Sequence, residues 1–345
     1  MPVRMRRRIF IVSALAVIAA AVLLIVFVMQ RKLPPRSVGL LPPADAIFYL
    51  NINIVRRAGA FAALAGVTRE AEYEDFVRQT GFQFERDLDE AAFAVHAPHA
   101  PAGSRVIPNE DNRFSEIFSG KWDEDRVRAW LQRRTATTEE HRGTTIFAIP
   151  HEGRTVRVAL LDRTTAAVSN TESSDAIHAM IDRRHDAAGL SPLVEHYYRE
   201  VPYGSLAWLI ATVAPAPETG VQSLVPTTGG IASPSWLRDI AGGTVLVASL
   251  RFVTSLQLRA EAIADSPARA QQVAENANAW LAVFRTLEQG VELKGFDADV
   301  KTVFASLTIT QESDRAVVQA QIPIGALRKL AIGEAAAEAP SAPKK

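Results

Sequence analysis

The chain has 345 residues, and its 38 lysine and arginine side chains are balanced by 38 aspartate and glutamate side chains. This zero formal net charge argues against a polybasic nucleic-acid binder, so no nucleic-acid partner is expected. Because the sequence contains no cysteine, disulfides, Cys-liganded zinc, iron–sulfur clusters and thiol nucleophiles are excluded. A composition of 48% hydrophobic and 22% charged residues is typical of a globular protein.

The charges are unevenly distributed along the chain. The first 36 residues contain seven basic side chains and no acidic one. The remaining 309 residues carry 31 basic and 38 acidic side chains, a net formal charge of −7. The basic start suits anionic lipid headgroups, whereas the acidic remainder is expected to stand clear of them.

The longest apolar run extends from Ile9 to Met29, and Ser13 is its one residue that is not apolar. At about 1.5 Å per residue, a helix of this length matches a hydrocarbon core of about 30 Å. We therefore predict a transmembrane helix at 9–29 after a basic cytoplasmic start at 1–8. The alternative, a cleaved signal peptide, requires an apolar region of about 7 to 15 residues and a cleavage site of small residues.

The basic residues on the two sides of this run suggest its orientation. Arg4, Arg6, Arg7 and Arg8 precede the run, whereas Arg31, Lys32 and Arg36 follow it. We expect a single-pass protein of the bacterial inner (cytoplasmic) membrane, with a cytoplasmic N-terminus and an extracytoplasmic body. The positive-inside rule discriminates here by only about two charges, so the opposite orientation stays open.

The rest of the chain is predicted to form an α+β body of largely antiparallel sheets with packed helices. A proline-rich spacer at 30–43 is expected to hold this body off the membrane. A first α+β half at 44–213 is followed by a connection rich in proline and glycine at 214–243, a second α+β half at 244–333 and a disordered tail at 334–345.

Alternating or helical apolar patterns predict the elements of both halves. Strands are expected at 46–54, 91–96, 114–121, 137–141, 144–149, 155–161, 165–169, 205–213, 244–252, 254–260, 306–311 and 316–322. Helices are expected at 55–67, 70–80, from Asp123 onward, at 173–184, 192–200 and 266–288, and near Leu327.

Common catalytic motifs are absent from the sequence. There is no GxSxG, HExxH, GxGxxG or Walker A pattern, so nothing favours a serine hydrolase, a zincin or a nucleotide-binding enzyme. One candidate metal site remains, because His178, Asp182 and His185 are spaced to lie along one stripe of the predicted helix at 173–184. Such ligands can hold Zn²⁺ with an open position for water. The alternative is a solvated helix flank, with Ile177, Met180 and Ile181 facing the core.

Four segments resemble uncharacterised single-pass, membrane-anchored envelope proteins of acidobacterial type. These segments are LPPADAIFYLNI, GFQFERDLDEAAFAV, IFSGKWDEDRVRAWL and VALLDRTTAAVSN. The similarity in element order covers most of residues 38–332. This resemblance implies an exported α+β body behind one anchor. It does not assign a catalytic role to any residue of this chain.

These observations leave two functional hypotheses from different classes. The first is a non-enzymatic membrane-tethered protein that binds or scaffolds at the cell envelope, with a partner protein, the cell wall or a small ligand, and without a cofactor. The second is a metal-assisted hydrolase of the envelope that uses the His178, Asp182 and His185 stripe.

Overall fold

A computed structural model of the protein divides the chain into two compact units, residues 1–35 and 36–345. The described residues are 33–57, 71–96, 113–186, 189–213, 244–252, 255–290, 302–303 and 305–323. The transmembrane helix predicted at 9–29, the connection at 214–243 and the tail at 334–345 lie outside them. Among the described residues, no helix is long and apolar enough to cross a membrane.

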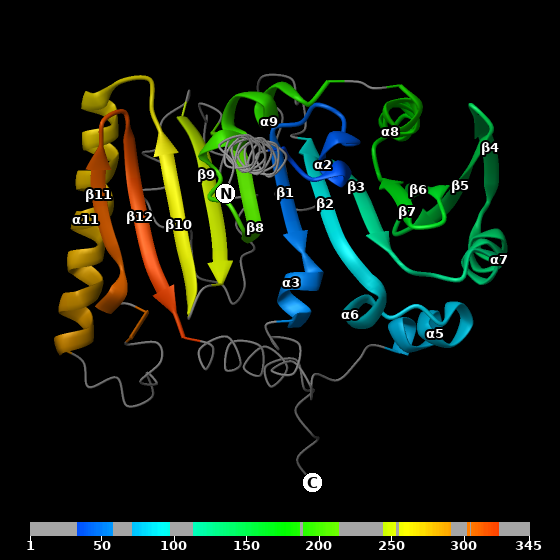
Figure 1. Ribbon diagram of the computed structural model, residues 1–345, viewed down its shortest axis with the longest axis horizontal. Coiled ribbons are helices and arrows are strands. Elements are labelled where there is room, and N and C mark those ends of the chain that lie inside the picture. Colours follow the sequence, from blue (N-terminus) through cyan, green and yellow to red (C-terminus); the bar gives the residue numbers. More distant parts are fainter. Residues whose placement is uncertain are drawn as a thin grey trace, which may run out of the picture. The chain divides into compact units, whose positions relative to one another are not determined.

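The second unit is built on one twelve-stranded antiparallel sheet (Figure 1). Its strand order is β11-β12-β10-β9-β8-β1-β2-β3-β7-β6-β5-β4. The strands are β1 (Ala46–Asn51), β2 (Leu88–His96), β3 (Arg113–Gly120), β4 (Thr137–His141), β5 (Thr144–His151), β6 (Arg154–Asp162), β7 (Thr165–Ser169), β8 (Ser205–Val213), β9 (Thr244–Phe252), β10 (Leu256–Ile263), β11 (Thr308–Glu312) and β12 (Arg315–Ile322). This confirms the predicted α+β class with antiparallel pairing.

The described helices connect or flank these strands. They are α2 (Arg36–Gly39), α3 (Ile52–Arg57), α5 (Ala71–Thr80), α6 (Phe84–Asp87), α7 (Glu124–Arg134), α8 (Asp175–His185), α9 (Pro192–Tyr197), the 3-10 helix η1 (Tyr198–Glu200) and α11 (Pro267–Gly290). The start of α7 is as predicted, because the Asp123 side chain accepts a hydrogen bond from the Arg126 backbone N–H at 3.1 Å.

The two predicted halves contribute to the same sheet. Strands β1 to β8 come from residues 44–213, and β9 to β12 come from residues 244–333. The halves meet where β8 pairs with β9, for example where Trp208 lies opposite Ser249. The hydrogen-bonded ladder therefore runs without interruption from one half to the other.

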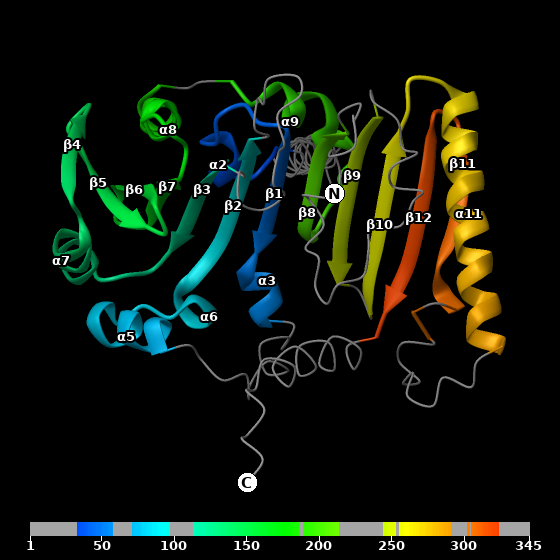
Figure 2. The same cartoon turned by 180° about the vertical axis from the view of Figure 1, so that it is seen from behind.

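Helices cover opposite faces of the sheet at its two ends (Figures 1 and 2). On one face, Ile47 and Trp208 belong to the main core together with Met180 of α8 and Val194 of α9. On the other face, α11 packs on β10 and β12, where its Val273 joins a smaller core. A strand such as β10 thus turns its apolar residues toward α11 and its polar residues toward the opposite side.

The end of the sheet formed by β7, β6, β5 and β4 curls around α8 (Figure 1). Helix α8 packs on β6 and β7, and its buried residues Ile177, Met180 and Ile181 face the core as predicted. The side chains on its flank reach the edge strand β4. Two-residue turns make this curl compact, since Arg142 and Gly143 both have positive φ angles, of 50° and 76°.

The predicted strand at 46–54 is wrong in its last part. Strand β1 ends at Asn51, and Ile52 begins the helix α3. The Asn51 side chain accepts a hydrogen bond from the Ile54 backbone N–H at 3.0 Å, which caps the new helix. The alternating apolar pattern of 46–54 favoured a strand throughout. The strand ends early because Asn51 caps a helix within this pattern.

The proline-rich segment predicted as a spacer at 30–43 is part of the folded body from Arg36 onward. Residues Arg36–Gly39 form α2, and the side chains of Val38 and Leu41 are 1% and 0% exposed in the main core. The part of this segment from Arg36 onward therefore packs against the sheet, where the sequence predicted a separating linker.

Candidate functional site

Two places in the second unit gather polar side chains with a defined geometry. The first is the contact between α8 and the edge strand β4, which contains two of the three residues predicted to bind metal. The second is a hollow on the sheet face formed by β9, β10, β12 and β11.

At the first place, two imidazole rings stack and each meets a carboxylate. The rings of His141 on β4 and His178 on α8 have centroids 4.1 Å apart and an interplanar angle of 11°. His141 Nε2 lies 2.8 Å from Asp182 Oδ1, within hydrogen-bond geometry. His178 Nε2 lies 2.6 Å from Glu139 Oε1, a close approach that lacks hydrogen-bond alignment. The hydrogen bond from His141 holds the pKa of the Asp182 carboxyl below its usual range, against the opposing effect of burial.

The structure brings together only part of the predicted metal stripe. His178 and Asp182 both face β4, whereas His185 at the end of α8 is exposed and has no polar partner in the described part of the chain. No group of three or more His, Asp or Glu side chains within the described ranges is arranged to hold a metal ion. Zinc binding by this stripe therefore stays a prediction.

The partners on β4 were missed by the sequence analysis. Glu139 and His141 are two residues apart, so they share one face of the strand, and Arg142 follows at the turn. Arg142 Nε lies 2.8 Å from Asp182 Oδ1, and its Nη1 donates to Asp186 Oδ2 at 2.8 Å. The sequence shows that Glu139 and His141 are two residues apart. It does not show that they contact α8, because this contact depends on the curl of the sheet.

The second place is a groove whose floor consists of two rows of polar side chains. The residues of each row lie directly opposite one another in the antiparallel register and so share a face. What we call the Arg251 row consists of Arg251, Gln257 and Gln321. What we call the Arg259 row consists of Ser249, Arg259, Gln319 and Thr308.

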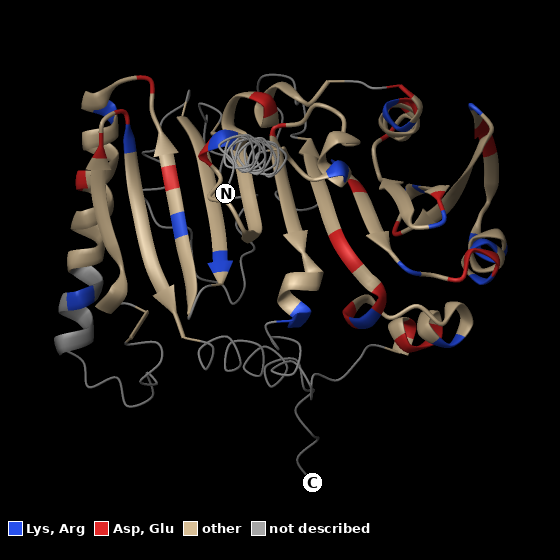
Figure 3. Cartoon of the chain, viewed as in Figure 1, with Lys and Arg blue, Asp and Glu red and all other residues tan. Residues whose placement is uncertain are grey.

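These two rows, with Pro202 and Ser306 at the sides, line a hollow of about 390 Å³. The described residues of its lining supply guanidinium, amide and hydroxyl groups, and none of them carries a carboxylate or an imidazole. Figure 3 shows that β10 carries charged segments along its length, whereas β1 and β8 are tan throughout. Helix α11 packs on the opposite face of β10 and β12, so the groove has a rigid floor.

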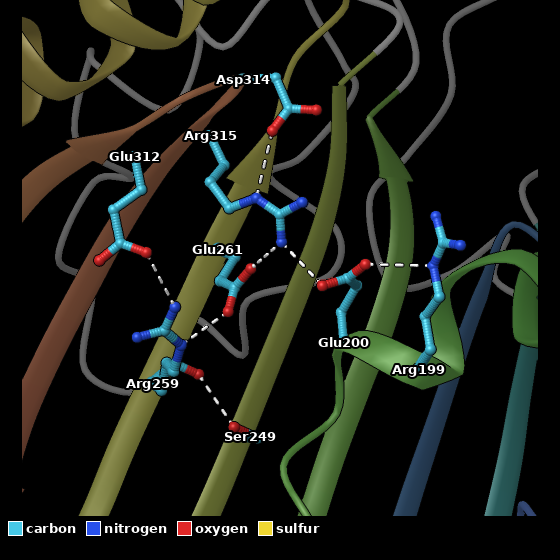
Figure 4. Close-up of polar contacts among 8 residues, drawn as sticks. All are labelled: Arg199, Glu200, Ser249, Arg259, Glu261, Glu312, Asp314 and Arg315. Carbon is cyan, nitrogen blue, oxygen red and sulfur yellow. Dashed lines mark hydrogen bonds and ion pairs between the residues drawn. The ribbon is translucent and has the colours of Figure 1, made fainter. Parts of the chain in front are cut away.

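A charge network around the buried carboxylate of Glu261 adjoins the groove at Arg259 (Figure 4). Glu261 on β10, with a side chain 5% exposed, bridges two arginines. Its Oε1 lies 2.6 Å from Arg259 Nε, and its Oε2 lies 2.7 Å from Arg315 Nη1. Buried carboxylates need such pairing, because an isolated charge in the interior is costly.

The network extends from the sheet to η1 and to β11. Arg315 Nη1 also donates to Glu200 Oε2 at 2.8 Å, and Arg259 Nη2 lies 3.3 Å from Glu312 Oε2. The hydrogen bond with Glu200 raises the pKa of the Arg315 guanidinium, burial opposes this, and the bond with Glu261 raises it further. Arg259 and Arg315 therefore stay charged and fixed at this end of the groove.

The groove was not predicted from the sequence, although its strands were. Residues 257, 259 and 261 alternate as polar with apolar neighbours, as do 319 and 321, which only indicates strands with one polar face. The rows exist because β9, β10 and β12 pair in one particular register. A shift of one residue in any strand would turn its polar side chains toward α11.

Comparisons with models of protein families and with curated proteins find no match to this chain. Among solved structures, crystal form III of TP0453 is similar over 87% of this chain and 98% of that chain, at 11% sequence identity and a TM-score of 0.47. Crystal form I of TP0453 is similar over 88% of this chain and 99% of that chain, at 13% identity and a TM-score of 0.42. Nothing about function follows from a likeness at this level.

Proposed function

We propose that the protein is a non-enzymatic, membrane-tethered binding protein of the bacterial cell envelope, whose groove binds a hydroxyl-rich saccharide. The observation that carries the proposal is the pair of polar rows across β9, β10 and β12, over a hollow of about 390 Å³. Small-molecule sites have volumes of about 300 to 1,000 Å³, so there is room for a ligand of about a disaccharide's size.

The chemistry of the lining supports a saccharide. The side chains of Gln257, Gln319 and Gln321 each offer an amide donor and an acceptor, while Ser249 and Thr308 offer hydroxyls. A ligand with many hydroxyl groups can satisfy both kinds of partner at once. Because these groups stand on paired strands, their backbone is already ordered, which reduces the entropic cost of binding.

The composition of the lining also favours binding over catalysis. General acid–base chemistry requires a side chain such as His, Asp or Glu within hydrogen-bond reach of the substrate. None of these residue types is found among the described residues that line the groove. Within this described lining, the serine and threonine hydroxyls have no neighbouring base that would activate them as nucleophiles.

The tether in this proposal is the apolar run Ile9 to Met29. A helix over this run would span the inner membrane, with the N-terminus in the cytoplasm and residues 36–345 outside it. A body with net negative charge would stand clear of anionic lipids, so the groove would be available to envelope components.

Binding of two saccharide probes to the full chain in lipid nanodiscs tests the function. The probes are digalacturonate and its neutral counterpart galactobiose. Isothermal titration calorimetry measures the affinity of the chain for each probe. We expect at least one probe to bind, and the double variant Gln319→Ala, Gln321→Ala to bind it about tenfold more weakly. The matched control is Gln271→Ala, Gln272→Ala on the exposed flank of α11, which should bind as the unchanged chain does. Equal weakening in both double variants, or no binding of either probe, would refute the function.

The competing proposal is the metal-assisted hydrolase. The placement of His141 beside His178 and Asp182 favours it, since a second imidazole replaces His185 near the predicted stripe. The test is the zinc content of the purified full chain and its melting temperature with added zinc. A stoichiometric metal lost in His178→Ala but retained in His185→Ala would support a metal centre, and no metal with unchanged melting would exclude it.

A further inference from the structure

The groove contains two arginines in different electrostatic situations. Arg259 is paired with the carboxylates of Glu261 and Glu312. Arg251 has one polar side-chain contact among the described residues, a hydrogen bond from its Nη2 to the neutral amide oxygen Gln257 Oε1 at 2.8 Å. A guanidinium has five N–H donors, so most of those on Arg251 are available to a ligand.

The carboxylates near the groove in the described part of the chain are engaged with other arginines. Glu261 is shared by Arg259 and Arg315, and Glu200 pairs with Arg315 and Arg199. Figure 4 shows these contacts converging at one end of β10 and β12. The network thus uses the local negative charge at that end, and no carboxylate among the described residues pairs with the Arg251 row.

The spacing of the rows separates Arg251 from this network. Gln257, which lies opposite Arg251, precedes Glu261 by four residues on β10. At about 3.4 Å per residue, the Arg251 row is about 14 Å from the Glu261 position along the strand. The Debye length at physiological ionic strength is about 8 Å, so the Glu261 charge is largely screened at Arg251 wherever solvent fills the groove.

We infer that the ligand of this groove is an acidic saccharide, whose carboxylate is bound by the Arg251 guanidinium while its hydroxyls meet the glutamines. This inference rests on the proposed function and specifies its ligand class. A planar guanidinium can bind a carboxylate through two parallel hydrogen bonds, which gives both affinity and orientation. Gln257 accepts a hydrogen bond from Arg251 and so holds that guanidinium in place, and on its other side Gln257 lies opposite Gln321 in the register.

The test compares digalacturonate with galactobiose on the full chain in nanodiscs of zwitterionic lipid. The unchanged chain should bind digalacturonate about tenfold more tightly, and Arg251→Gln should abolish this preference while galactobiose affinity changes by less than about twofold. Arg251→Lys keeps the charge but loses the planar fork, so it should retain an intermediate preference. The control Arg78→Gln, on α5 outside the groove, removes the same charge and should keep the full preference.

Each other outcome has a definite meaning. Equal affinity for the two probes, with both weakened by Gln319→Ala, Gln321→Ala, would overturn the acidic ligand but leave the proposed function standing. A preference that survives in Arg251→Gln would overturn the role of Arg251. Acetate that competes as strongly as digalacturonate would refute saccharide binding and leave Arg251 as a simple anion site. A melting temperature of Arg251→Gln equal to that of the unchanged chain shows that this variant is folded. If Arg251→Gln is not folded, the preference of Arg251→Lys for digalacturonate decides the role of Arg251.

Discussion

Glu261 on β10 and Arg315 on β12 are joined by an Oε2 to Nη1 distance of 2.7 Å, at a point where the Glu261 side chain is only 5% exposed. This pair ties together two strands of the second half, and Glu200 links it to η1 in the first half. One carboxylate therefore helps to hold the groove floor, the 3-10 helix and the β12 strand in a single arrangement.

Glu261→Gln should lower the free energy of unfolding by about 2 kcal/mol, because Arg259 and Arg315 would lose their shared partner in a largely desolvated place. The measurement is urea denaturation of the full chain in detergent micelles, followed by circular dichroism. Glu312→Gln is the matched control, since its side chain is 50% exposed and a surface pair contributes about 1 kcal/mol or less. Equal losses in the two variants would contradict the prediction.

Glu116 on β3 should make stability fall as the pH rises. Its side chain lies between Phe93 and Val168 on the neighbouring strands, and burial raises its pKa from 4.5 to about 7. Between these two values the unfolded chain ionises this carboxyl while the folded chain keeps it protonated, so folding is penalised progressively, and fully above pH 7.

Glu116→Gln should therefore be more stable than the unchanged chain by roughly 3 kcal/mol at pH 8 and about equally stable at pH 4. The check is urea denaturation at pH 4, 6 and 8. A stability difference that is constant across these pH values would show that Glu116 titrates normally in the fold.

His141→Ala should raise the pKa of Asp182 toward its ordinary value of 3.8, because the hydrogen bond from His141 is the largest cause of its lowering. Carboxylate carbon NMR of the labelled chain measures this titration. The lowered pKa contributes stability that is present above pH 3.8 and is lost as the pH falls through the folded value. The variant should thus lose less stability than the unchanged chain on acidification below that pH.

His185→Ala is the control for this titration. His185 is exposed on the same helix, so its replacement by alanine should leave the pKa of Asp182 unchanged. An equal effect of both variants would mean that the histidines act through general charge and that the His141 contact has no special role.

Leu41→Ala should cost about 3 kcal/mol of stability, since Leu41 is 0% exposed and its removal leaves a cavity in the main core. The matched control is Leu33→Ala, which also precedes two prolines but is 66% exposed. Its expected effect is within about 0.5 kcal/mol of zero. A small effect of Leu41→Ala would restore the interpretation of this segment as a free spacer.

The strands and helices were predictable because their signals are local. The caps at Asp123, the turn at Arg142-Gly143 and the apolar stripe of α8 need only neighbouring residues, and the structure has each of them. The start of helix α3 was predicted three residues too late, because a single side-chain cap at Asn51 decided between two conformations of an alternating segment. Local patterns carry little information about such a choice.

The candidate sites were less predictable, since their parts are far apart in the chain. The stripe His178 and Asp182 was visible in the helix, but Glu139 and His141 come from a strand some forty residues earlier. The groove combines residues from 202 to 321. No spacing rule links such positions.

Composition and periodicity are enough to predict the α+β class and the antiparallel strands with their polar alternation, and to recognise the basic, apolar N-terminal run. The folded arrangement was needed to show that one sheet joins both halves, that Leu41 is core and that Arg251 stands apart from the carboxylates around Arg259. These facts depend on strand order and register. Register depends on how all twelve strands and their helices bury apolar surface together, a cooperative property of the whole fold.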